Sequence, residues 1–301
     1  MTLRQLRYVL AVAELGSFTR AAEELHVSQP TLSQQVRALE AELGGPLLRR
    51  PPSAVQLTPA GHALAAEARV AVGSADRAAR AARAAMGSEP LRLEVATTHL
   101  LAVGLLPACI ERLRTLVPGC VVELHEHRDG TRVEQALLDG CAEIGVAPRP
   151  ACWPGAVEPL GSDELVVVLP EGDPLLRSGA PVAPAALGDR GWVLFEPGHE
   201  LADTVAQASE RGGVQPVPAV HVAEAATAAR MAAAGAGPTL MPQAVVPREL
   251  QDVCRPIDPP ATWDVVALAR TPAWSPAAQA FLTILRESAW WRARPRLRCA
   301  A

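Results

Sequence analysis

SFTRAAEELHVSQPTLSQQVR, residues 17–37, is the stretch that decides the amino-terminal fold. Its first half repeats apolar residues at three- and four-residue steps, which predicts one face of a short helix: Phe18, Ala21, Ala22 and Leu25. His26-Val27 then turns the chain, and Ser28 is a candidate N-cap for the next helix. Pro30 falls in the first turn of that helix, where its missing N–H costs nothing. The stretch therefore predicts two short amphipathic helices joined by a tight turn.

A further helix is predicted immediately before this stretch. Its apolar face is formed by residues at helical spacing, namely Leu3, Leu6, Leu10 and Ala13. We expect Gly16 to end this helix and Ser17 to cap the following one, where a hydroxyl accepts an orphan backbone N–H.

The outward side of the helix after Ser28 carries side chains suited to DNA bases. Leu32, Val36, Leu39 and Leu43 form its apolar stripe, which leaves another set facing outward: Gln29, Pro30, Ser33, Gln34 and Arg37. Gln pairs with adenine, Arg with guanine or phosphate, and Pro touches a thymine methyl. Each residue alone is equally typical of a solvated surface helix, but the ordered set favours a recognition helix in a major groove.

LRQLRYVLAVAELGSFTRAAEELHVSQPTLSQQVRALEAELGGPLL (residues 3–48) and LTPAGHAL (57–64) resemble the winged helix-turn-helix of LysR-type transcriptional regulators. The resemblance implies that the helix within 28–43 is the recognition helix. The DNA-contacting residues that we expect are Arg20, Ser28, Gln29, Pro30, Thr31, Ser33, Gln34, Arg37, Arg49 and Arg50. This chain has Gln34 where the family usually has Arg, and its wing segment, residues 49–56, is interrupted by proline. The first departure predicts an altered base preference or fewer phosphate contacts, and the second predicts no wing contacts beyond Arg50.

The charge of the chain argues against a general nucleic-acid coat. The net charge is −4 over 301 residues. Residues 1–60 carry six Arg and five Glu, a local net charge of +1. Because one such unit would hold phosphate weakly, we expect DNA binding to need at least a dimer. Neither an apolar run of about 18 residues nor a charged-then-apolar leader is present, so we expect a cytoplasmic protein without membrane contact.

An Ala- and Arg-rich segment, residues 59–88, predicts a helix about 40 Å long at 1.5 Å per residue. Small residues keep helical spacing along it: Leu64, Ala68, Ala71, Ala75, Ala78 and Ala82. We expect this narrow stripe to find no partner in its own chain, which favours pairing with a second copy; a solvated spacer helix is the alternative. In the resembled family the corresponding helix dimerises.

Strands and helices alternate from residue 91 onward, which predicts a mostly parallel sheet covered by helices. One series ends near Pro159-Leu160-Gly161, and a second begins at Glu164 and returns near Asp264. This order is similar to the two-lobed periplasmic-binding-protein fold, which LysR-type regulators use as their effector domain. We therefore predict an α+β multidomain protein: a winged helix-turn-helix (1–58), a linker helix (59–88) and a two-lobed α/β effector domain (89–301). Lobe 1 is expected at about 91–161 and 265–301, and lobe 2 at about 162–264.

The resembled fold binds its ligand between the lobes, at strand ends and helix amino termini. Thr97, Thr98 and His99 follow the first strand, where hydroxyls, backbone N–H groups and an imidazole favour an anion. Thr97 and Thr98 are equally suited to be plain N-caps. Gly237 is expected in a turn that lets backbone approach a ligand. The remaining candidates for effector binding are Ala147, Arg149, Phe195 and Gly198.

The six cysteines lie at 109, 120, 141, 152, 254 and 299, without a C-x-x-C pair. We expect buried, inert thiols, with a redox-sensing pair as the alternative. His125 and His127 alternate on a predicted strand and make a poor metal site by themselves. No metal or other cofactor is predicted.

We predict a LysR-type transcriptional regulator that is not an enzyme. Its expected partners are promoter DNA, a small and possibly anionic effector, RNA polymerase and further copies of itself, as a dimer through the linker helix and a homotetramer. The alternatives are a solute-binding or enzyme-like α/β protein and a nucleoid-type DNA binder. No Ser/His/Asp order, metal spacing or phosphate loop supports catalysis.

Overall fold

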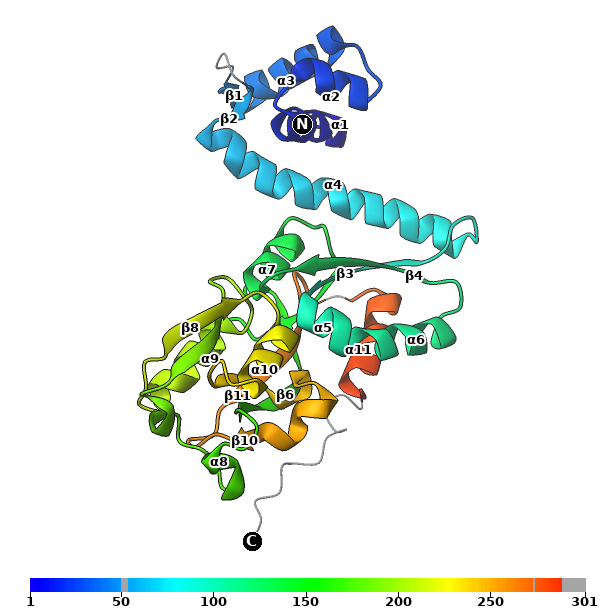
Figure 1. The fold of residues 1–301 in the computed structure, drawn as a ribbon. Coiled ribbons are helices and arrows are strands. Elements are labelled where there is room, and N and C mark those ends of the chain that lie inside the picture. Colours follow the sequence, from blue (N-terminus) through cyan, green and yellow to red (C-terminus); the bar gives the residue numbers. More distant parts are fainter. Residues whose placement is uncertain (50–53, 273, 289–301) are drawn as a thin grey trace. The chain divides into compact units, whose positions relative to one another are not determined.

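The computed structural model describes residues 1–49, 54–272 and 274–288. The chain divides into two compact units, which are described separately (Figure 1). The first comprises residues 1–92 with 135–142, and the second contains 93–134 and the chain from residue 143 onward. Among the described residues, no helix is both long enough and apolar enough to cross a membrane.

Three helices open the first unit: α1 (Leu3–Leu15), α2 (Phe18–Glu24) and α3 (Gln29–Leu43). Gly16 ends α1 in the left-handed conformation, with φ 64°. The Ser17 hydroxyl accepts the Arg20 N–H at the start of α2, and the Ser28 hydroxyl accepts the Thr31 N–H at the start of α3. The predicted helix ends and caps are therefore confirmed.

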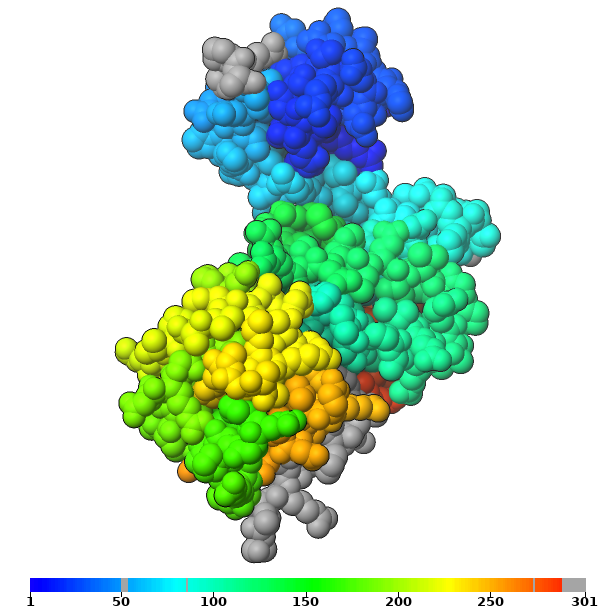
Figure 2. Space-filling model, in the orientation of Figure 1, coloured from blue at the N-terminus to red at the C-terminus, as the bar shows by residue number. Residues whose placement is uncertain are grey.

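The core of this unit lies where the three helices cross. Leu32, Val36 and Leu39 of α3 are at most 1% exposed, so this part of the predicted apolar stripe is buried. The prediction is wrong for Leu43, the last residue of α3, which is 49% exposed. Ala21 and Ala22 of α2 are buried against it, and their small side chains permit a close helix crossing. The blue atoms of these helices form a closely packed body in Figure 2.

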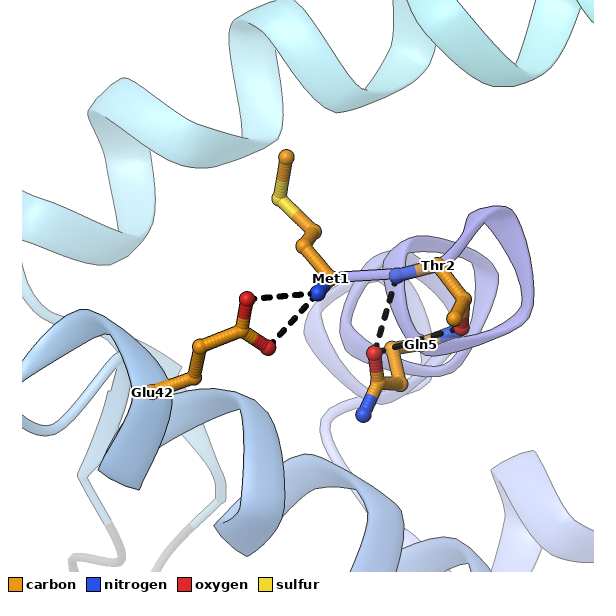
Figure 3. A network of polar contacts seen from close by, with 4 residues as sticks. All are labelled: Met1, Thr2, Gln5 and Glu42. Atoms are coloured by element: carbon orange, nitrogen blue, oxygen red, sulfur yellow. Dashed lines mark hydrogen bonds and ion pairs between the residues drawn. The ribbon is translucent and has the colours of Figure 1, made fainter.

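Polar contacts at the start of α1 complete this packing (Figure 3). Thr2 and Gln5 form a reciprocal capping box, in which each side chain accepts the other residue's backbone N–H. The amino group of Met1 lies 2.6 Å from the carboxylate of Glu42, near the end of α3. The two helix ends are thereby linked.

A two-stranded wing follows α3, formed by β1 (Leu48–Arg49) and β2 (Gln56–Leu57) in antiparallel register. The Glu40 carboxylate on α3 accepts the backbone N–H groups of Leu47 and Leu48 at 2.8 and 3.2 Å. The start of the wing is therefore fixed to the helix that is predicted to read DNA.

The long helix α4 (Pro59–Ala85) begins at a Thr58 cap and has 27 residues, about 40 Å at 1.5 Å per residue. Ala65 and Ala68 are each 1% exposed and belong to the helix-turn-helix core, where α4 packs on α1. The expectation that the alanine stripe finds no partner in its own chain is thus wrong for its first turns. Farther along, Ala78 and Ala82 are exposed.

The second unit contains most of the remaining elements. Its strands are β3 (Arg92–Thr98), β4 (Val121–His127), β5 (Ile144–Pro148), β6 (Ala156–Val168), β7 (Gly191–Phe195), β8 (Val217–Val222), β9 (Thr239–Pro242), β10 (Cys254–Pro256) and β11 (Thr262–Ala269). Its α-helices are α5 (His99–Gly104), α6 (Leu106–Leu116), α7 (Gly130–Leu138, shared with the first unit), α8 (Pro174–Arg177), α9 (Ala202–Arg211), α10 (Ala225–Ala233) and α11 (Pro276–Arg286). Short 3-10 helices span Pro184–Leu187, Gln243–Val245 and Arg248–Val253.

Seven strands form one mixed sheet in the order β10-β6-β11-β5-β3-β4, with β9 also paired to β6. Strands β3 and β5 pair in parallel, but β6 and β11 are antiparallel to their partners. The prediction of a mostly parallel sheet is therefore wrong. A separate parallel pair, β7 and β8, forms a second small sheet.

Strands β6 and β11 connect the two halves of this unit. The second series was expected to begin at Glu164, but β6 begins at Ala156 and runs unbroken through Pro159-Leu160-Gly161 for 13 residues. The pairing with β11 shifts register between Val265 and Val266, opposite these residues, and such an irregularity accommodates a proline within a strand. We call β3, α5, α6, β4 and β5 lobe A, and β7, α9, β8, α10 and β9 lobe B.

Two helices follow β3 instead of one continuous helix. Helix α5 ends at Gly104 and α6 begins at Leu106, with Pro107 in its first turn. Because Pro107 lacks the N–H that would continue the hydrogen-bond ladder of α5, the break falls just before it.

Candidate DNA-binding helix and inter-lobe effector site

The exposed side of α3 carries most of the side chains predicted to contact DNA. Pro30, Thr31, Gln34 and Arg37 are exposed, and Gln29 is half-buried at the first position of the helix. The carboxamides and the guanidinium can reach a ligand without any rearrangement of the core. This surface, together with Ser28 before it, has the donors and acceptors needed for base edges.

Ser33 is an exception to that pattern. It is 3% exposed, and Arg37 covers it by donating to the Ser33 hydroxyl at 3.1 Å and to its carbonyl oxygen at 3.3 Å. The placement of Ser33 on the outward side is therefore wrong. Ser33 supports Arg37 from one turn earlier on the helix.

The other predicted basic contacts are only partly described. Arg20 on α2 and Arg49 on β1 are both exposed, and Arg20 also donates to the Leu15 carbonyl oxygen at 3.4 Å. Arg50 lies outside the described residues. The guanidinium groups of Arg20, Arg37 and Arg49 are thus accessible to phosphate.

Thr97 and Thr98 end strand β3 and are fully buried. The Thr97 hydroxyl donates to the Val146 carbonyl oxygen at 2.9 Å, which fixes β3 to β5. The Thr98 hydroxyl does not cap α5; it faces the carboxyl of Glu200 and acts to lower the pKa of that group. The alternative of two plain N-caps therefore does not hold.

Glu200 meets Thr98 from the other lobe and was not identified from the sequence. It lies just before α9 in lobe B, is 9% exposed, and its Oε1 accepts the Leu100 N–H of lobe A at 3.1 Å. Its Oε2 is likewise buried, and the Thr98 hydroxyl faces this carboxyl. Burial raises the pKa of Glu200 to about 7, against the opposing effects of the nearby Thr98 hydroxyl, the Leu100 N–H and His99.

His99 is held between carboxylates of both lobes. Its Nδ1 lies 3.0 Å from Glu126 of lobe A, and its Nε2 lies 3.7 Å from Glu224 of lobe B. The hydrogen bond with Glu126 and the charge of Glu224 raise the pKa of His99 above its usual value, in spite of some burial. The imidazolium form is thus favoured by its surroundings.

Phe195 and His199 stack in lobe B, with ring centroids 4.4 Å apart. Nδ1 of His199 accepts the Leu201 N–H at 3.1 Å, and burial lowers the pKa of His199 to about 4. His199 is therefore neutral at pH 7. Its ring packs against Phe195, and its Nδ1 accepts a hydrogen bond. Beside it, Glu196 pairs with Arg128 of lobe A at 3.0 Å.

Three polar contacts thus join the lobes: Leu100 to Glu200, His99 to Glu224, and Arg128 to Glu196. We call these six residues, together with Thr98 and Glu126, the inter-lobe cluster. Sequence reasoning found Thr98 and His99 but missed the carboxylates. A charged residue beside a strand end has the same local sequence pattern whether it faces solvent or another lobe. The sequence therefore contains no signal that distinguishes these carboxylates from ordinary surface carboxylates.

The remaining predicted effector residues lie apart from these contacts. Ala147 is buried in β5, and Arg149 is exposed, with its backbone N–H donating to the Asp264 carbonyl oxygen at 2.8 Å. Gly198 has φ 82° in the turn before His199. At Gly237, φ is 133° and an added Cβ would collide with the Gly191 carbonyl oxygen. The close approach that needs a glycine is therefore to Gly191 rather than to a ligand.

No disulfide joins the five cysteines that the structure describes. Cys109, Cys120 and Cys254 are buried as expected, and burial raises the pKa of the Cys109 and Cys120 thiols. Cys141 and Cys152 are exposed, so burial was wrongly predicted for them. Cys299 lies outside the described residues.

Comparison with known proteins gives matches along most of the chain. The family described as "Bacterial regulatory helix-turn-helix protein, lysR family" matches residues 3–62, and "LysR substrate binding domain" matches residues 86–290. The probable cat1 operon transcriptional activator of Acinetobacter lwoffii is 32% identical over 245 residues, 80% of each chain. The probable hydrogen peroxide-inducible genes activator of Mycobacterium avium is 35% identical, covering 82% of this chain and 80% of its own.

Solved structures are similar over nearly the full length. Full-length CbnR complexed with its target DNA has a TM-score of 0.65 and 29% identity, covering 95% of this chain and 99% of the other. Together these matches include both the helix-turn-helix and the inter-lobe cluster.

Proposed function

Because this chain belongs to the LysR family of transcriptional regulators, we propose that it binds a promoter site through α3 and responds to a small molecule held between lobes A and B. It is a DNA-binding regulator with an effector-binding domain, and not an enzyme. The observation that carries the DNA-binding part is the exposed row of polar side chains on α3, positioned by two serine caps over a closed apolar core.

The bases are contacted by Gln29, Pro30 and Gln34, and phosphate by Arg20, Arg37 and Arg49. Ser28 and Thr31, whose hydroxyl oxygens lie 2.7 Å apart at the start of α3, are further donors to the DNA backbone. Ser33 acts indirectly, by holding Arg37. Arg50 is expected to continue this surface into the wing.

The active species is an oligomer. Residues 1–60 carry a net charge of only +1, which supplies little phosphate affinity per copy. Two copies linked together bind neighbouring half-sites with a higher effective concentration. The exposed alanines of α4, Ala78 and Ala82, suit close helix packing in a dimer. Two dimers make the proposed tetramer, which acts in the cytoplasm and there contacts RNA polymerase.

Control by the effector requires two arrangements of the lobes with different ligand affinity. The inter-lobe cluster supports this, because the three contacts that cross between the lobes are polar, and two of them, His99 to Glu224 and Arg128 to Glu196, are exposed. A ligand that binds between the lobes replaces some of these contacts and shifts the population. The names of relatives refer to different targets, the cat1 operon and hydrogen peroxide-inducible genes, so no effector is transferred from them to this chain.

A selection experiment tests the proposed function. Purified full-length chain is mixed with sheared DNA from the organism that encodes it, and the bound fragments are sequenced. We expect a defined, partly palindromic site whose binding survives salt concentrations that remove a scrambled duplex of the same length. Equal loss of both duplexes with salt would leave only non-specific binding and contradict the proposal.

A further inference from the structure

The carboxylate of Glu40 is placed where its charge is unfavourable. Glu40 lies in the last turn of α3, at the negative end of the helix dipole, and this fully described helix has no basic residue in that turn. It also follows Arg37 by one turn on the helix that is proposed to contact DNA, so its charge repels phosphate. A carboxylate that opposes both the helix and the ligand calls for another role.

The Glu40 side chain reaches from α3 to the start of the wing. Its Oε1 alone accepts two backbone N–H groups, from Leu47 at 2.8 Å and from Leu48 at 3.2 Å. Both leucines are buried, and hydrogen bonds to an ionised acceptor are strong in such surroundings. Arg49, which is exposed and is proposed to contact phosphate, is the next residue of β1. The carboxylate therefore acts on the backbone immediately before Arg49.

The covalent connection between α3 and the wing is short and lacks packing at its glycines. It consists of Gly44, Gly45 and Pro46. A Cβ added to either glycine would have no neighbour within 4 Å, so neither position offers side-chain contacts that could orient the connection. The bonds of Glu40 supply a direct link from α3 to β1 instead.

Other hydrogen bonds hold the wing to the neighbouring helices. The Val55 N–H donates to the Gly16 carbonyl oxygen at the end of α1, and the Thr58 N–H donates to the Leu47 carbonyl oxygen at the start of α4, each at 2.9 Å. These bonds remain when the side chain of Glu40 is removed. We therefore expect a variant without this carboxylate to keep the fold of the unit and to lose the link between α3 and the wing.

We propose that Glu40 is a positioning residue for DNA binding, which holds Arg49 of the wing at a fixed place relative to α3. The inference rests on the DNA binding proposed above and deepens it. Phosphate contacts fix the register of a protein on the duplex, whereas contacts to base edges read the sequence. Arg49 and Gln29 engage the same duplex together only if the wing and α3 keep a defined spacing, and the two hydrogen bonds of Glu40 maintain it.

The salt dependence of DNA binding tests this inference, because the slope of log Kd against log salt concentration reports the number of phosphate contacts. It is measured by fluorescence anisotropy with full-length protein and the selected promoter site. Arg49→Ala should make the slope less steep by about 1 for each wing that contacts DNA. Glu40→Ala should weaken binding several-fold and reduce the slope in the same direction, although removal of a negative charge alone would strengthen binding. In the Arg49→Ala background, Glu40→Ala should not reduce the slope further.

Two variants serve as matched controls. Glu40→Gln keeps an oxygen that can accept both N–H groups, so it should retain the wild-type slope. Glu42→Ala removes an equal charge from the same end of α3, where Glu42 binds the amino group of Met1 rather than the wing (Figure 3), and its slope should also be unchanged. A purely structural role of Glu40 would lower the fraction of folded protein, measured by circular dichroism, without changing the slope.

An unchanged slope in folded Glu40→Ala would overturn the inference. An unchanged slope in Arg49→Ala, or a loss from Glu40→Ala that persists in the Arg49→Ala background, would overturn it as well. Should Glu40→Ala not fold, Glu40→Asp keeps the charge, shortens the reach by one methylene group and is measured in the same way. An unchanged slope in that folded variant likewise overturns the inference.

The same slopes are measured on a scrambled duplex, because a phosphate contact does not depend on base sequence. Unchanged slopes beside successful selection of a promoter site remove only this inference. Failed selection beside the expected slopes removes the proposed base recognition and leaves the role of Glu40 in place.

Discussion

Replacing Glu200 by Gln should change how the stability of this protein depends on pH. The carboxyl of Glu200 has its pKa raised from 4.5 to about 7 in the folded chain, with burial as the largest cause. Glutamine has nearly the same volume and no titrating proton. The substitution therefore removes one titration and leaves the packing between Leu100 and α9 almost unchanged.

The sign follows from proton binding. Between pH 4.5 and about 7 the folded chain holds a proton on Glu200 that the unfolded chain has released. The free energy of unfolding therefore falls as pH rises through this window, at about 1.4 kcal/mol per pH unit. Over the whole shift, this amounts to about 3 kcal/mol of stability present at low pH and lost above pH 7.

Urea unfolding followed by tryptophan fluorescence measures this effect. All six tryptophans lie after residue 152, so the signal reports on the effector-binding part and not on the helix-turn-helix. The difference in unfolding free energy between wild type and Glu200→Gln cancels titrations that both proteins share. From about pH 5 to pH 8 that difference should fall by about 2 to 3 kcal/mol. A difference that stays flat would refute the assigned burial of this carboxyl.

Other parts of the structure give smaller predictions. Ser28→Ala should lower the stability of the helix-turn-helix by about 1 kcal/mol, measured by circular dichroism, because the cap on the Thr31 N–H is lost; an unchanged transition would contradict it. Thr98→Val should change the unfolding free energy by less than about 1 kcal/mol and leave promoter binding intact, while abolishing the effector response. Ala82→Glu should dissociate the α4 dimer in sedimentation, and Ala84→Glu, on the opposite side of α4, should not.

Local rules predicted the first unit well. Gly16, Ser17 and Ser28 each act through a backbone group no more than four residues away, so their roles as helix ends can be deduced from short spacing. The family resemblance rested on the same residues. Ser33 shows the limit, because its burial depends on the direction that the long Arg37 side chain takes.

The second unit was predicted less accurately because its contacts join distant residues. The unbroken strand β6 depends on pairing with β11, about 100 residues later, and this pairing overrides the local turn signal of Pro159 and Gly161. In the same way, Glu200 meets Leu100 only after the lobes have formed. A carboxyl group whose partner lies 100 residues away has no local sequence pattern.

The central claim is that α3 reads the base sequence of a promoter. Fluorescence anisotropy with the selected site and a scrambled duplex measures this claim directly, comparing wild type with Gln29→Ala. Gln279→Ala, an exposed glutamine on α11, is the matched control. We predict that Gln29→Ala weakens binding to the selected site about ten-fold, as expected for loss of a bidentate base contact, with little change on scrambled DNA. Equal losses on both duplexes would contradict base recognition by α3.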